Sequence, residues 1–377
     1  MLKVAFVIPD LSTGGVETNF LRLINSLPSD SITSSVIYQN ETDNQVYRSK
    51  FDSKINFFKL NSSNTFNFLK SIKNYFNKIN PDIIVVSMYG VAFLIIIARL
   101  LSDHKPKIIV NGSGHFSSII AHMPRLKERL FLRIGARATL HLADFFVSQC
   151  QAMTDDLMQY TSLPNEKISV INNPIITEDY QKIIRAPLSH KWLNEKDRNY
   201  KIIIMAGRLV PQKGVLEFLE IFKKLAKRNL NIKLIILGEG ELQETIKKKI
   251  QDLNLSNIVD LLPNQENYPS FIAACDLFVV NSIYEGLNNM IVESLACGTS
   301  VVSTDCPVGP SEVLVNGKFG RLVQLGNEGQ MIKMIEEELK SLSRNKELLK
   351  GRAEDFKVEK ATFAYVKLFN KITSTRT

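Results

Sequence analysis

Residues 201–214 read KIIIMAGRLVPQKG and contain the structural unit from which the chain is built. The run Lys201–Ala206 is apolar and β-branched, which is typical of a buried strand. Gly207 follows as a turn, and a helical apolar pattern then covers Gly214–Lys227. A buried strand that passes through a turn into a helix is one βα unit. A series of such units predicts a parallel sheet covered by helices.

The same alternation extends in both directions along the chain. The other predicted strands are Leu2–Ile8, Ile32–Tyr38, Ile83–Ser87, Lys107–Val110, Phe145–Ser148, Ile168–Ile171, Ile232–Leu237, Ile258–Leu262, Leu277–Val280 and Thr299–Ser303. The other predicted helices are Val16–Leu27, Phe66–Asn77, Val91–Leu101, Arg125–Leu142, Met153–Tyr160, Glu241–Leu253 and Met290–Cys297. The segment Asn172–Tyr200 breaks the alternation with two prolines and many charges, and we interpret it as the connection between two domains. Domains of this class bind ligands at the carboxyl ends of their strands.

Length and composition agree with two soluble globular domains. The chain has 377 residues, of which 45% are apolar and 23% charged, and these values exclude disorder, collagen and a disulfide scaffold. The 47 Lys and Arg residues outnumber the 38 Asp and Glu residues. This excess favours an anionic partner, which is a nucleotide, a phospholipid surface or nucleic acid.

Cysteine spacing and apolar runs give further expectations about the chain's environment. The four cysteines form no Cys-x-x-Cys pair, so we expect free thiols in a reducing compartment, with neither zinc nor disulfide. The N-terminal apolar run leads to Asp10 rather than to a cleavage site, so no signal peptide is expected. The uncharged stretch Ile83–Ala98 is shorter than the roughly 20 residues of a membrane span. We interpret it as a strand joined through Tyr89-Gly90 to a buried helix.

Two cations follow the strand Lys201–Ala206. Because the carboxyl end of that strand carries the turn, Arg208 and Lys213 are expected to point toward a ligand site, where both side chains suit phosphate. Two solvated loop charges would give the same pattern. The stretch lacks the Gly-x-x-x-x-Gly-Lys-Ser/Thr spacing of a P-loop.

A second stretch, residues 281–293, reads NSIYEGLNNMIVE and again follows an apolar strand. A helix is predicted to begin near Leu287, and its free N–H groups would attract an anion. Glu285 lies in the loop and Glu293 inside the helix. Carboxylates are poor ligands for phosphate but good hydrogen-bond acceptors for sugar hydroxyls. The alternative is that Glu285 caps the helix and Glu293 is a surface charge.

Glycine pairs give weaker signals. Gly14-Gly15 lies between the first strand and the first helix, where backbone N–H groups could approach a bound group, although a tight turn would look the same. Gly238-Glu239-Gly240 lacks the third glycine of the dinucleotide fingerprint and an acidic residue placed to bind a ribose, so we reject a dinucleotide site there.

Taken together, these motifs resemble the GT-B glycosyltransferases of family 4, which are retaining enzymes that use nucleotide sugars. Besides the stretches above, the resemblance rests on Gly14-Gly15, Val170-Ile171-Asn172-Asn173-Pro174, Gly238-Glu239-Gly240, Ala296-Cys297-Gly298 and Gly309-Pro310-Ser311-Glu312. The last of these is similar to the branch that builds bacterial surface polysaccharide and lipopolysaccharide. The resemblance implies an α/β fold with two Rossmann-like domains whose parallel sheets face each other across a cleft. It places an acceptor-binding domain at residues 1–175, a nucleotide-sugar domain at 176–355, and a final helix at 356–377 that packs on the first domain.

The resemblance also implies roles for individual residues. The donor-binding residues would be Gly14, Gly15, Gly207, Arg208, Lys213, Gly286, Leu287, Asn288 and Glu293. Arg208 and Lys213 would hold the diphosphate and Glu293 the ribose hydroxyls, while Glu285 would bind the transferred sugar. Family members often carry a histidine near the reacting sugar, and His115 is the candidate here, although it lies several residues late. The catalytic set would therefore be Glu285, His115, Arg208 and Lys213.

A basic helix is predicted near the middle of the first domain. It carries Arg125, Lys127, Arg129, Arg133 and Arg137, and the last three share one face beside Leu126, Leu130 and Ile134. Such a helix can lie on an anionic membrane, and many family members use lipid-linked acceptors. A solvated face of an ordinary helix is the alternative.

These features predict a retaining, peripheral enzyme on the inner face of the cytoplasmic membrane. It would move a hexose or N-acetylhexosamine from a nucleotide sugar, with UDP favoured over GDP or ADP, to a lipid-linked or polysaccharide acceptor. No Asp-x-Asp metal signature occurs, so neither a divalent metal nor a cofactor is expected, and front-face substitution is the mechanistic hypothesis. The alternatives are a sugar-nucleotide epimerase of the same fold and a basic nucleic-acid-binding or scaffold protein.

Overall fold

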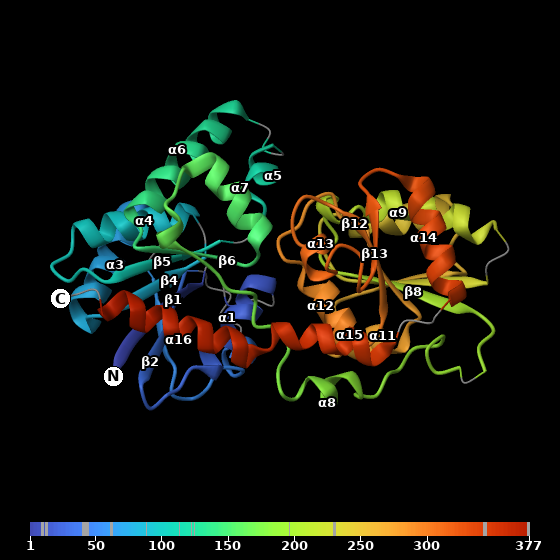
Figure 1. The fold of residues 1–377 in the computed structure, drawn as a ribbon, viewed down its shortest axis with the longest axis horizontal. Coiled ribbons are helices and arrows are strands. Elements are labelled where there is room, and N and C mark those ends of the chain that lie inside the picture. Colours follow the sequence, from blue (N-terminus) through green and yellow to red (C-terminus); the bar gives the residue numbers. More distant parts are fainter. Residues whose placement is uncertain are drawn as a thin grey trace. The chain divides into compact units, whose positions relative to one another are not determined.

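The computed structural model describes residues 1–8, 11, 14–39, 45–60, 63–87, 89–112, 114–121, 123, 125–195, 197–228, 231–341 and 345–374. The chain forms two compact units, shown in Figure 1. Unit 1 consists of Met1–Ile175 and Val358–Thr377, and unit 2 consists of Ile176–Lys357.

Unit 1 contains a parallel sheet with the strand order β3-β2-β1-β4-β5-β6-β7. Its strands are β1 (Leu2–Ile8), β2 (Ile32–Tyr38), β3 (Asn56–Lys59), β4 (Ile83–Val86), β5 (Lys107–Asn111), β6 (Phe145–Ser148) and β7 (Ile168–Val170). Its helices are α1 (Gly15–Ser26), α2 (Gln45–Arg48), α3 (Thr65–Ile79), α4 (Tyr89–Leu100), α5 (Phe116–Ala121), α6 (Leu126–Leu142), α7 (Gln151–Thr161) and α16 (Val358–Ser374), with a 3-10 turn at Asn165–Lys167. The order of the strands along the chain reverses between β1 and β4, while all strands remain parallel.

Helices cover both faces of this sheet because each has one apolar side. On one face, Phe20 of α1 and Phe369 of α16 pack into a core with Phe6 of β1. On the other face, Phe76 of α3 and Ile95 of α4 pack into a second core with other residues of the sheet. The final helix α16 therefore belongs to unit 1, where it lies against α1 (Figure 1).

The long apolar run has the predicted form. It consists of the buried strand β4 and the helix α4, of which Ala92, Ile95 and Ile96 are fully buried. Across the described ranges, no helix is both long and apolar enough to cross a bilayer.

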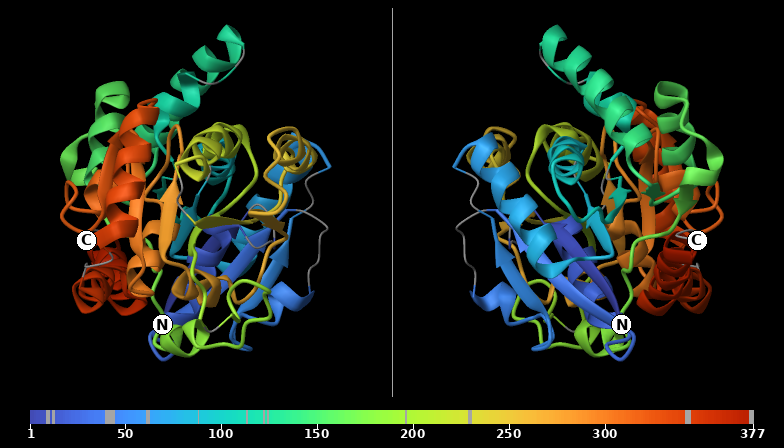
Figure 2. Two further views of the ribbon diagram at one scale, coloured as in Figure 1. Left: turned by 90° about the vertical axis from the view of Figure 1, so that its right-hand side faces the viewer. Right: turned by 90° about the vertical axis from the view of Figure 1, so that its left-hand side faces the viewer.

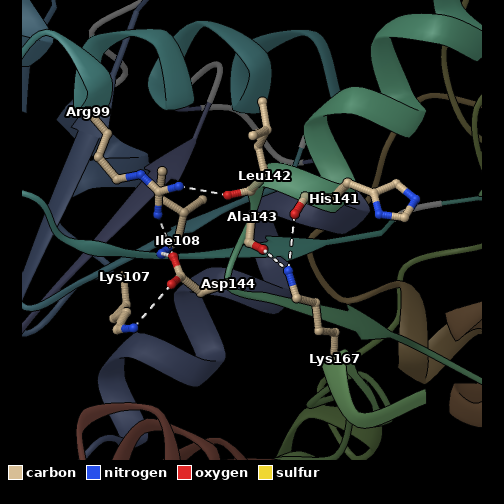
Figure 3. Close-up of polar contacts among 8 residues, drawn as sticks. All are labelled: Arg99, Lys107, Ile108, His141, Leu142, Ala143, Asp144 and Lys167. Carbon is tan, nitrogen blue, oxygen red and sulfur yellow. Dashed lines mark hydrogen bonds and ion pairs between the residues drawn. The ribbon is translucent and has the colours of Figure 1, made fainter. Parts of the chain in front are cut away.

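A polar cluster holds the carboxyl end of α6 to the sheet, as Figure 3 shows. Asp144 accepts hydrogen bonds from Arg99 and from the Ile108 backbone N–H, the latter at 2.9 Å, and it pairs with Lys107 at 3.2 Å. Arg99 also donates to the Leu142 carbonyl at 2.6 Å. Cations beside the last carbonyls of a helix satisfy its free acceptors and complement its dipole. The cluster is therefore a structural anchor for α6, whose other end extends away from unit 1 in Figure 2.

Unit 2 contains a second parallel sheet, with the order β10-β9-β8-β11-β12-β13 and a reversal between β8 and β11. Its strands are β8 (Lys201–Ala206), β9 (Ile232–Leu237), β10 (Val259–Leu262), β11 (Leu277–Val280), β12 (Ser300–Asp305) and β13 (Arg321–Gln324). Its helices are α8 (Tyr180–Ile184), α9 (Val215–Ala226), α10 (Gln243–Asp252), α11 (Tyr268–Ala274), α12 (Asn289–Ala296), α13 (Pro310–Val313), α14 (Glu328–Ser341) and α15 (Lys346–Ala353), with 3-10 turns at Pro211–Lys213 and Glu354–Phe356. The parallel α/β organisation predicted from the alternation is confirmed in both units.

Three local expectations need correction. The edge strands β3 and β13 were not predicted, because four residues that mix apolar and polar side chains give no strand signal. The helix predicted over Arg125–Leu142 begins at Leu126, and the short helix α5 precedes it. The segment interpreted as a connection packs mainly on unit 2, where Tyr180, Trp192 and Tyr200 are buried. Because this segment contains prolines and many charges, its sequence did not indicate that these aromatic residues would be buried.

Candidate functional site

A pocket lies at the carboxyl ends of the central strands of unit 2, where the strand order reverses. It is lined by the last residues of β8, β9 and β11 and by residues of the loops after β8 and β11, among them Gly207, Arg208, Lys213, Asn281, Glu285 and Asn288. Its empty space of about 360 Å³ includes open solvent. Open parallel sheets bind ligands at this position, because loops diverge there from neighbouring strands and leave a crevice.

The glycine-rich turn after β9 supports the turn that carries Arg208. The Leu209 N–H donates to the Glu239 carbonyl at 2.8 Å, and the Leu242 N–H donates to the Leu209 carbonyl at 3.0 Å. A Cβ atom at Gly238 would overlap the Gly207 carbonyl. Gly238-Glu239-Gly240 therefore packs backbone against backbone, which agrees with the rejection of a dinucleotide motif.

Lys213 and Glu285 come from different loops and pair inside the pocket. Lys213 Nζ lies 2.6 Å from Glu285 Oε1, and the Glu285 side chain is only 6% exposed. Gly214, at φ +60°, lets the loop turn closely past Asn281, whose Nδ2 donates to the Gly214 carbonyl at 2.8 Å. Gln212 bridges the same loops by donating to the Tyr284 carbonyl at 2.7 Å. These contacts fix the pair in position without a ligand.

Arg208 differs from Lys213 because it is exposed. Within the described part of the chain its side chain has no hydrogen-bond or ion-pair partner, although it lines the pocket. The pocket therefore offers one cation that is already paired and a second that is available to an anion. Arginine suits phosphate oxygens because its planar guanidinium can donate two parallel hydrogen bonds.

The helix after the acidic loop begins at Asn289, close to the predicted start near Leu287. Asn288 caps α12, and its side chain accepts a hydrogen bond from the Ile291 N–H at 3.3 Å. Leu287 is buried as a core residue, and Gly286 and Leu287 lie outside the pocket lining. A Cβ atom at Gly309 would overlap the Gly286 carbonyl. The late Gly-Pro-Ser-Glu motif thus fixes the backbone of the loop beside Glu285.

Glu293 is buried on α12 and also lies outside the pocket lining. The Tyr268 hydroxyl donates to its Oε1 at 2.5 Å. Burial raises the pKa of the Cys297 thiol, and the Glu293 carboxylate raises it further. The alternative interpretation of Glu293 as a surface charge is wrong, because the side chain is 2% exposed.

His115 lies in unit 1, at the turn before α5, and both ring nitrogens are engaged. Its Nδ1 lies 2.6 Å from Ser118 Oγ and its Nε2 lies 3.1 Å from Asp156 Oδ1. Burial alone would raise the pKa of Asp156, but hydrogen bonds from His115 and Ser117 outweigh it and keep this pKa below its ordinary value. The carboxylate therefore stays charged and orients the imidazole.

Gly14 caps α1 and Gly15 begins it. Close packing does not require a glycine at either position. A Cβ atom at Gly15 would meet nothing within 4 Å, and one at Gly14 would meet the flexible Glu17 side chain. The Gly14 carbonyl accepts the first helical hydrogen bond, from the Thr18 N–H at 2.9 Å.

Some of the cations on α6 that were predicted to contact a membrane make contacts within unit 1 instead. Arg129 donates to the Met123 carbonyl at 2.7 Å and the Ala121 carbonyl at 3.0 Å, and the Arg133 guanidinium lies over the Tyr160 ring. Arg125 is the N-cap rather than a helical residue, while Lys127 and Arg137 are exposed. Leu130 and Ile134 are also exposed, at 58% and 62%.

The remaining polar groups give no sign of a metal centre. In the ranges that the structure describes, no three His, Cys, Asp or Glu side chains are grouped to hold an ion. The four cysteines are buried free thiols, and burial raises the pKa of Cys306 to about 12.

The sequence analysis assigned no role to several residues that shape this site. Gln212 and Asn281 connect the two loops, and Gly309 fixes the backbone beside Glu285. Asn281 directly follows a predicted strand, so its place at a carboxyl end could have indicated it. Gln212 and Gly309 act across contacts that are distant in sequence, which no local signal reveals.

Two family models match the chain and together span most of it. Residues 13–179 match the model described as Glycosyltransferase Family 4, and residues 189–353 match the model described as Glycosyl transferases group 1. The chain belongs to the family 4 glycosyltransferases. The resemblance seen in the motifs is therefore confirmed.

Individual relatives agree with this assignment. The family 4 chain is 31% identical over 255 residues to an uncharacterized glycosyltransferase of Methanocaldococcus jannaschii, covering 66% of this chain and 61% of that protein. It is 32% identical over 218 residues to the N-acetylgalactosamine-N,N'-diacetylbacillosaminyl-diphospho-undecaprenol 4-alpha-N-acetylgalactosaminyltransferase of Campylobacter jejuni, covering 56% and 57%. The chain thus spans about three fifths of the length of these curated relatives.

A solved structure supports the fold. Anabaena HepE in complex with UDP-glucose matches with a TM-score of 0.76 at 17% identity, over 98% of this chain and all of that chain. Both units, each a parallel sheet covered by helices, therefore form a GT-B α/β fold.

Proposed function

We propose that this chain is a retaining glycosyltransferase that moves a hexose or N-acetylhexosamine from a UDP-sugar to a lipid-linked or polysaccharide acceptor in surface glycan biosynthesis. The observation that carries the proposal is the pocket of unit 2, in which an exposed arginine, a lysine and a buried carboxylate converge. A nucleotide sugar presents both diphosphate and sugar hydroxyls, and these groups need cations and hydrogen-bond acceptors. The Campylobacter relative is named for a diphospho-undecaprenol acceptor, and HepE was solved with UDP-glucose.

The pocket suits the charge that develops during sugar transfer. As the bond from the sugar to the nucleoside diphosphate breaks, negative charge grows on the leaving phosphate. Arg208 and Lys213 would stabilise that charge, and the N-terminal end of α12 would add its positive dipole. The pocket can thus stabilise a diphosphate with groups of the chain, and we keep metal-independent transfer as part of the proposal.

Glu285 would bind hydroxyls of the transferred sugar. In the free protein this carboxylate pairs with Lys213 at 2.6 Å. When a diphosphate arrives, Lys213 can exchange a carboxylate oxygen for a phosphate oxygen, which leaves Glu285 free to accept from the sugar. Retention by front-face substitution remains our mechanistic hypothesis, with the acceptor approaching on the side of the departing phosphate.

We further propose that α6 brings the enzyme to the inner face of the cytoplasmic membrane. Leu130 and Ile134 are exposed on this helix beside the cations Lys127 and Arg137. Exposed apolar side chains near cations suit the boundary between anionic headgroups and acyl chains.

Thermal unfolding with UDP-, GDP- and ADP-sugars, each with and without EDTA, tests the donor assignment. A ligand at ~100 times its dissociation constant adds about 2.7 kcal/mol of stability. We expect UDP-sugars alone to stabilise the protein and EDTA to leave that effect unchanged. The matched control is the Arg208→Ala/Lys213→Ala double variant, which should lose the UDP effect. Equal stabilisation of the control and the wild type would contradict the assignment of the two cations.

A further inference from the structure

The loop that carries Glu285 packs on one side against the short helix α13. Gly309 directly precedes this helix, and a Cβ atom there would overlap the Gly286 carbonyl and lie 2.9 Å from the Leu287 carbonyl oxygen. The backbones of the two segments are therefore in direct contact. The Val313 N–H donates to the Gly309 carbonyl at 2.9 Å, so the position of Gly309 depends on α13 as a whole.

Arg352 of α15 holds the carboxyl end of α13. A helix of one turn is not stable alone, because its few hydrogen bonds do not offset the cost of ordering it. The Arg352 Nε donates to the Val313 carbonyl and its Nη2 donates to the Glu312 carbonyl, both at 2.9 Å. These are the last two residues of α13. The planar guanidinium makes both bonds at once, in a fixed geometry that a lysine does not offer.

Further contacts fix the Arg352 side chain itself. Its Nη1 pairs with Asp355 Oδ2 at 2.8 Å, and its Cζ lies 4.9 Å from the centre of the Phe356 ring. All three guanidinium nitrogens are therefore engaged, and the side chain is only 17% exposed. Arg352 lies outside the pocket lining, so its effect on the pocket must pass through α13.

The other side of the loop has supports of its own. Gln212 donates to the Tyr284 carbonyl at 2.7 Å, and the Thr304 hydroxyl donates to the Ser282 carbonyl at 2.7 Å. These bonds hold the backbone before Glu285, whereas the backbone after it packs against the residue that precedes α13. Glu285 thus lies between two fixed points. Loss of either point would let its carboxylate move within the pocket.

We propose that Arg352 is a positioning residue for sugar transfer, because it holds α13 and thereby fixes Glu285 where the carboxylate can bind hydroxyls of the transferred sugar. The inference rests on the proposed function, in which Glu285 has this role. Arg208 and Lys213, which would bind the diphosphate, come from the loop after β8, which the glycine-rich turn after β9 supports. The role of Arg352 therefore concerns the sugar of the donor and not its diphosphate.

Arg352→Met in the full chain tests the proposal, because methionine keeps an unbranched side chain but cannot donate to the two carbonyls. Donor turnover is measured as UDP release from UDP-glucose, UDP-galactose and their N-acetylhexosamine counterparts. We expect it to fall about tenfold, since a small displacement of a substrate-binding group is costly to the rate. The affinity for UDP should not fall, because both cations stay in place. Wild-type turnover in this variant would overturn the proposal.

The conservative variant Arg352→Lys gives a graded readout. Lysine keeps the charge and can donate to one of the two carbonyls, but it lacks the planar fork. Its turnover should therefore lie between those of Arg352→Met and the wild type. If Arg352→Met does not fold, Arg352→Lys takes its place in the measurements below, and wild-type turnover in it would then overturn the proposal.

A double variant separates the positioning of Glu285 from a general loss of activity. If Arg352 acts through Glu285, its removal should matter little once the Glu285 carboxylate is absent. In the Glu285→Gln background we therefore expect Arg352→Met to lower turnover further by less than about twofold. A further loss of about tenfold, which would make the two effects independent, would refute the proposed role.

Arg321→Met is the matched control for a loss of stability. Arg321 of β13 also pairs with an acid of unit 2, since its Nε lies 3.1 Å from Oε2 of Glu338, which is 1% exposed, but it lies outside the pocket lining. Loss of this partner for a buried carboxylate should lower the Tm. Turnover of the folded control should stay within about twofold of the wild type. Equal losses of turnover in Arg321→Met and Arg352→Met would mean that Arg352 serves the fold alone.

The same measurements keep this inference apart from the proposed function. Normal UDP binding and turnover in the wild type, together with wild-type turnover in Arg352→Met, would refute only the role of Arg352. A wild type that releases UDP from none of these donors would refute the proposed function, and with it the role of Glu285 that Arg352 supports.

Discussion

The Lys213–Glu285 pair, taken with the proposed function, predicts that removal of the Glu285 carboxylate will tighten UDP binding. The pair is short, at 2.6 Å, and the two side chains are 20% and 6% exposed. A hydrogen bond with a charged group contributes about 1.5–3 kcal/mol, and a neutral one about 0.5–1.5 kcal/mol. Glu285→Gln keeps the shape and one acceptor oxygen but removes the charge. The ligand-free protein should therefore lose about 1–2 kcal/mol.

The free energy that the Lys213–Glu285 pair contributes in the ligand-free protein should also change the affinity for UDP. In the wild type a diphosphate must compete with Glu285 for Lys213, so part of the pair's contribution is lost on binding. The Glu285→Gln variant has no ion pair to break, so UDP binds to it without this loss. The affinity for UDP should therefore rise about 5- to 30-fold, which corresponds to 1–2 kcal/mol. Sugar transfer should nevertheless fall roughly 10- to 100-fold, because the sugar hydroxyls lose a charged acceptor.

Three measurements test this reasoning in one set of proteins. Calorimetry gives the UDP affinity, thermal unfolding should show a Tm lower by about 2–8 °C, and donor turnover reports the chemistry. Glu328→Gln is the matched control, since its pair with Lys224 is equally short at 2.6 Å but lies on an exposed surface. That control should change none of the three. A Glu285→Gln protein whose UDP affinity stays the same or falls would refute the exchange of partners at Lys213.

Arg208→Ala should weaken UDP binding about tenfold at an unchanged Tm, because the exposed guanidinium holds nothing else in the described chain; a lower Tm with normal UDP binding would contradict this. Gly309→Ala should lower the Tm of the protein and destabilise it by about 1–3 kcal/mol, because the residue has φ +97° and an added Cβ would overlap the Gly286 carbonyl. A wild-type Tm would argue against that close packing. Leu130→Ser combined with Ile134→Ser should reduce sedimentation with anionic vesicles while UDP binding stays constant; unchanged sedimentation would remove α6 from the membrane surface.

The sequence predicted most of the architecture, because both sheets consist of buried strands with strong β-branched runs. The strands β1, β2, β6, β8, β9 and β11 have the predicted bounds. The edge strands that were missed lie where local signals are weak, whereas the helix α14 was missed although it has a clear amphipathic pattern. Arg321–Gln324 has only four residues, and its pairing with β12 decides its conformation. The aromatic residues of 176–200 are buried by unit 2, although the surrounding sequence resembles a linker.

The candidate site was predicted less completely than the fold. Residue types after strand ends indicated Arg208, Lys213 and Glu285, and the structure brings these three into one pocket. The ion pair between Lys213 and Glu285 could not be predicted, since the two residues are 72 positions apart and meet only because β8 and β11 are neighbours. Local sequence patterns therefore identify the side chains, whereas sheet topology determines which of them become partners.

Unit 1 also has a pocket at the carboxyl ends of its central strands, but its side chains differ. In unit 2, Arg208 lies in the turn after β8 and Glu285 lies in the loop after β11, so that pocket contains charged side chains. In unit 1, Ser87 follows β4 and Asn111 ends β5, and both side chains are uncharged. Cations are easily noticed in a sequence, whereas an amide or hydroxyl after a strand resembles any polar loop residue. What distinguishes Ser87 and Asn111 is that their buried side-chain oxygens find no hydrogen-bond partner among the described residues, and this property exists only in the folded chain.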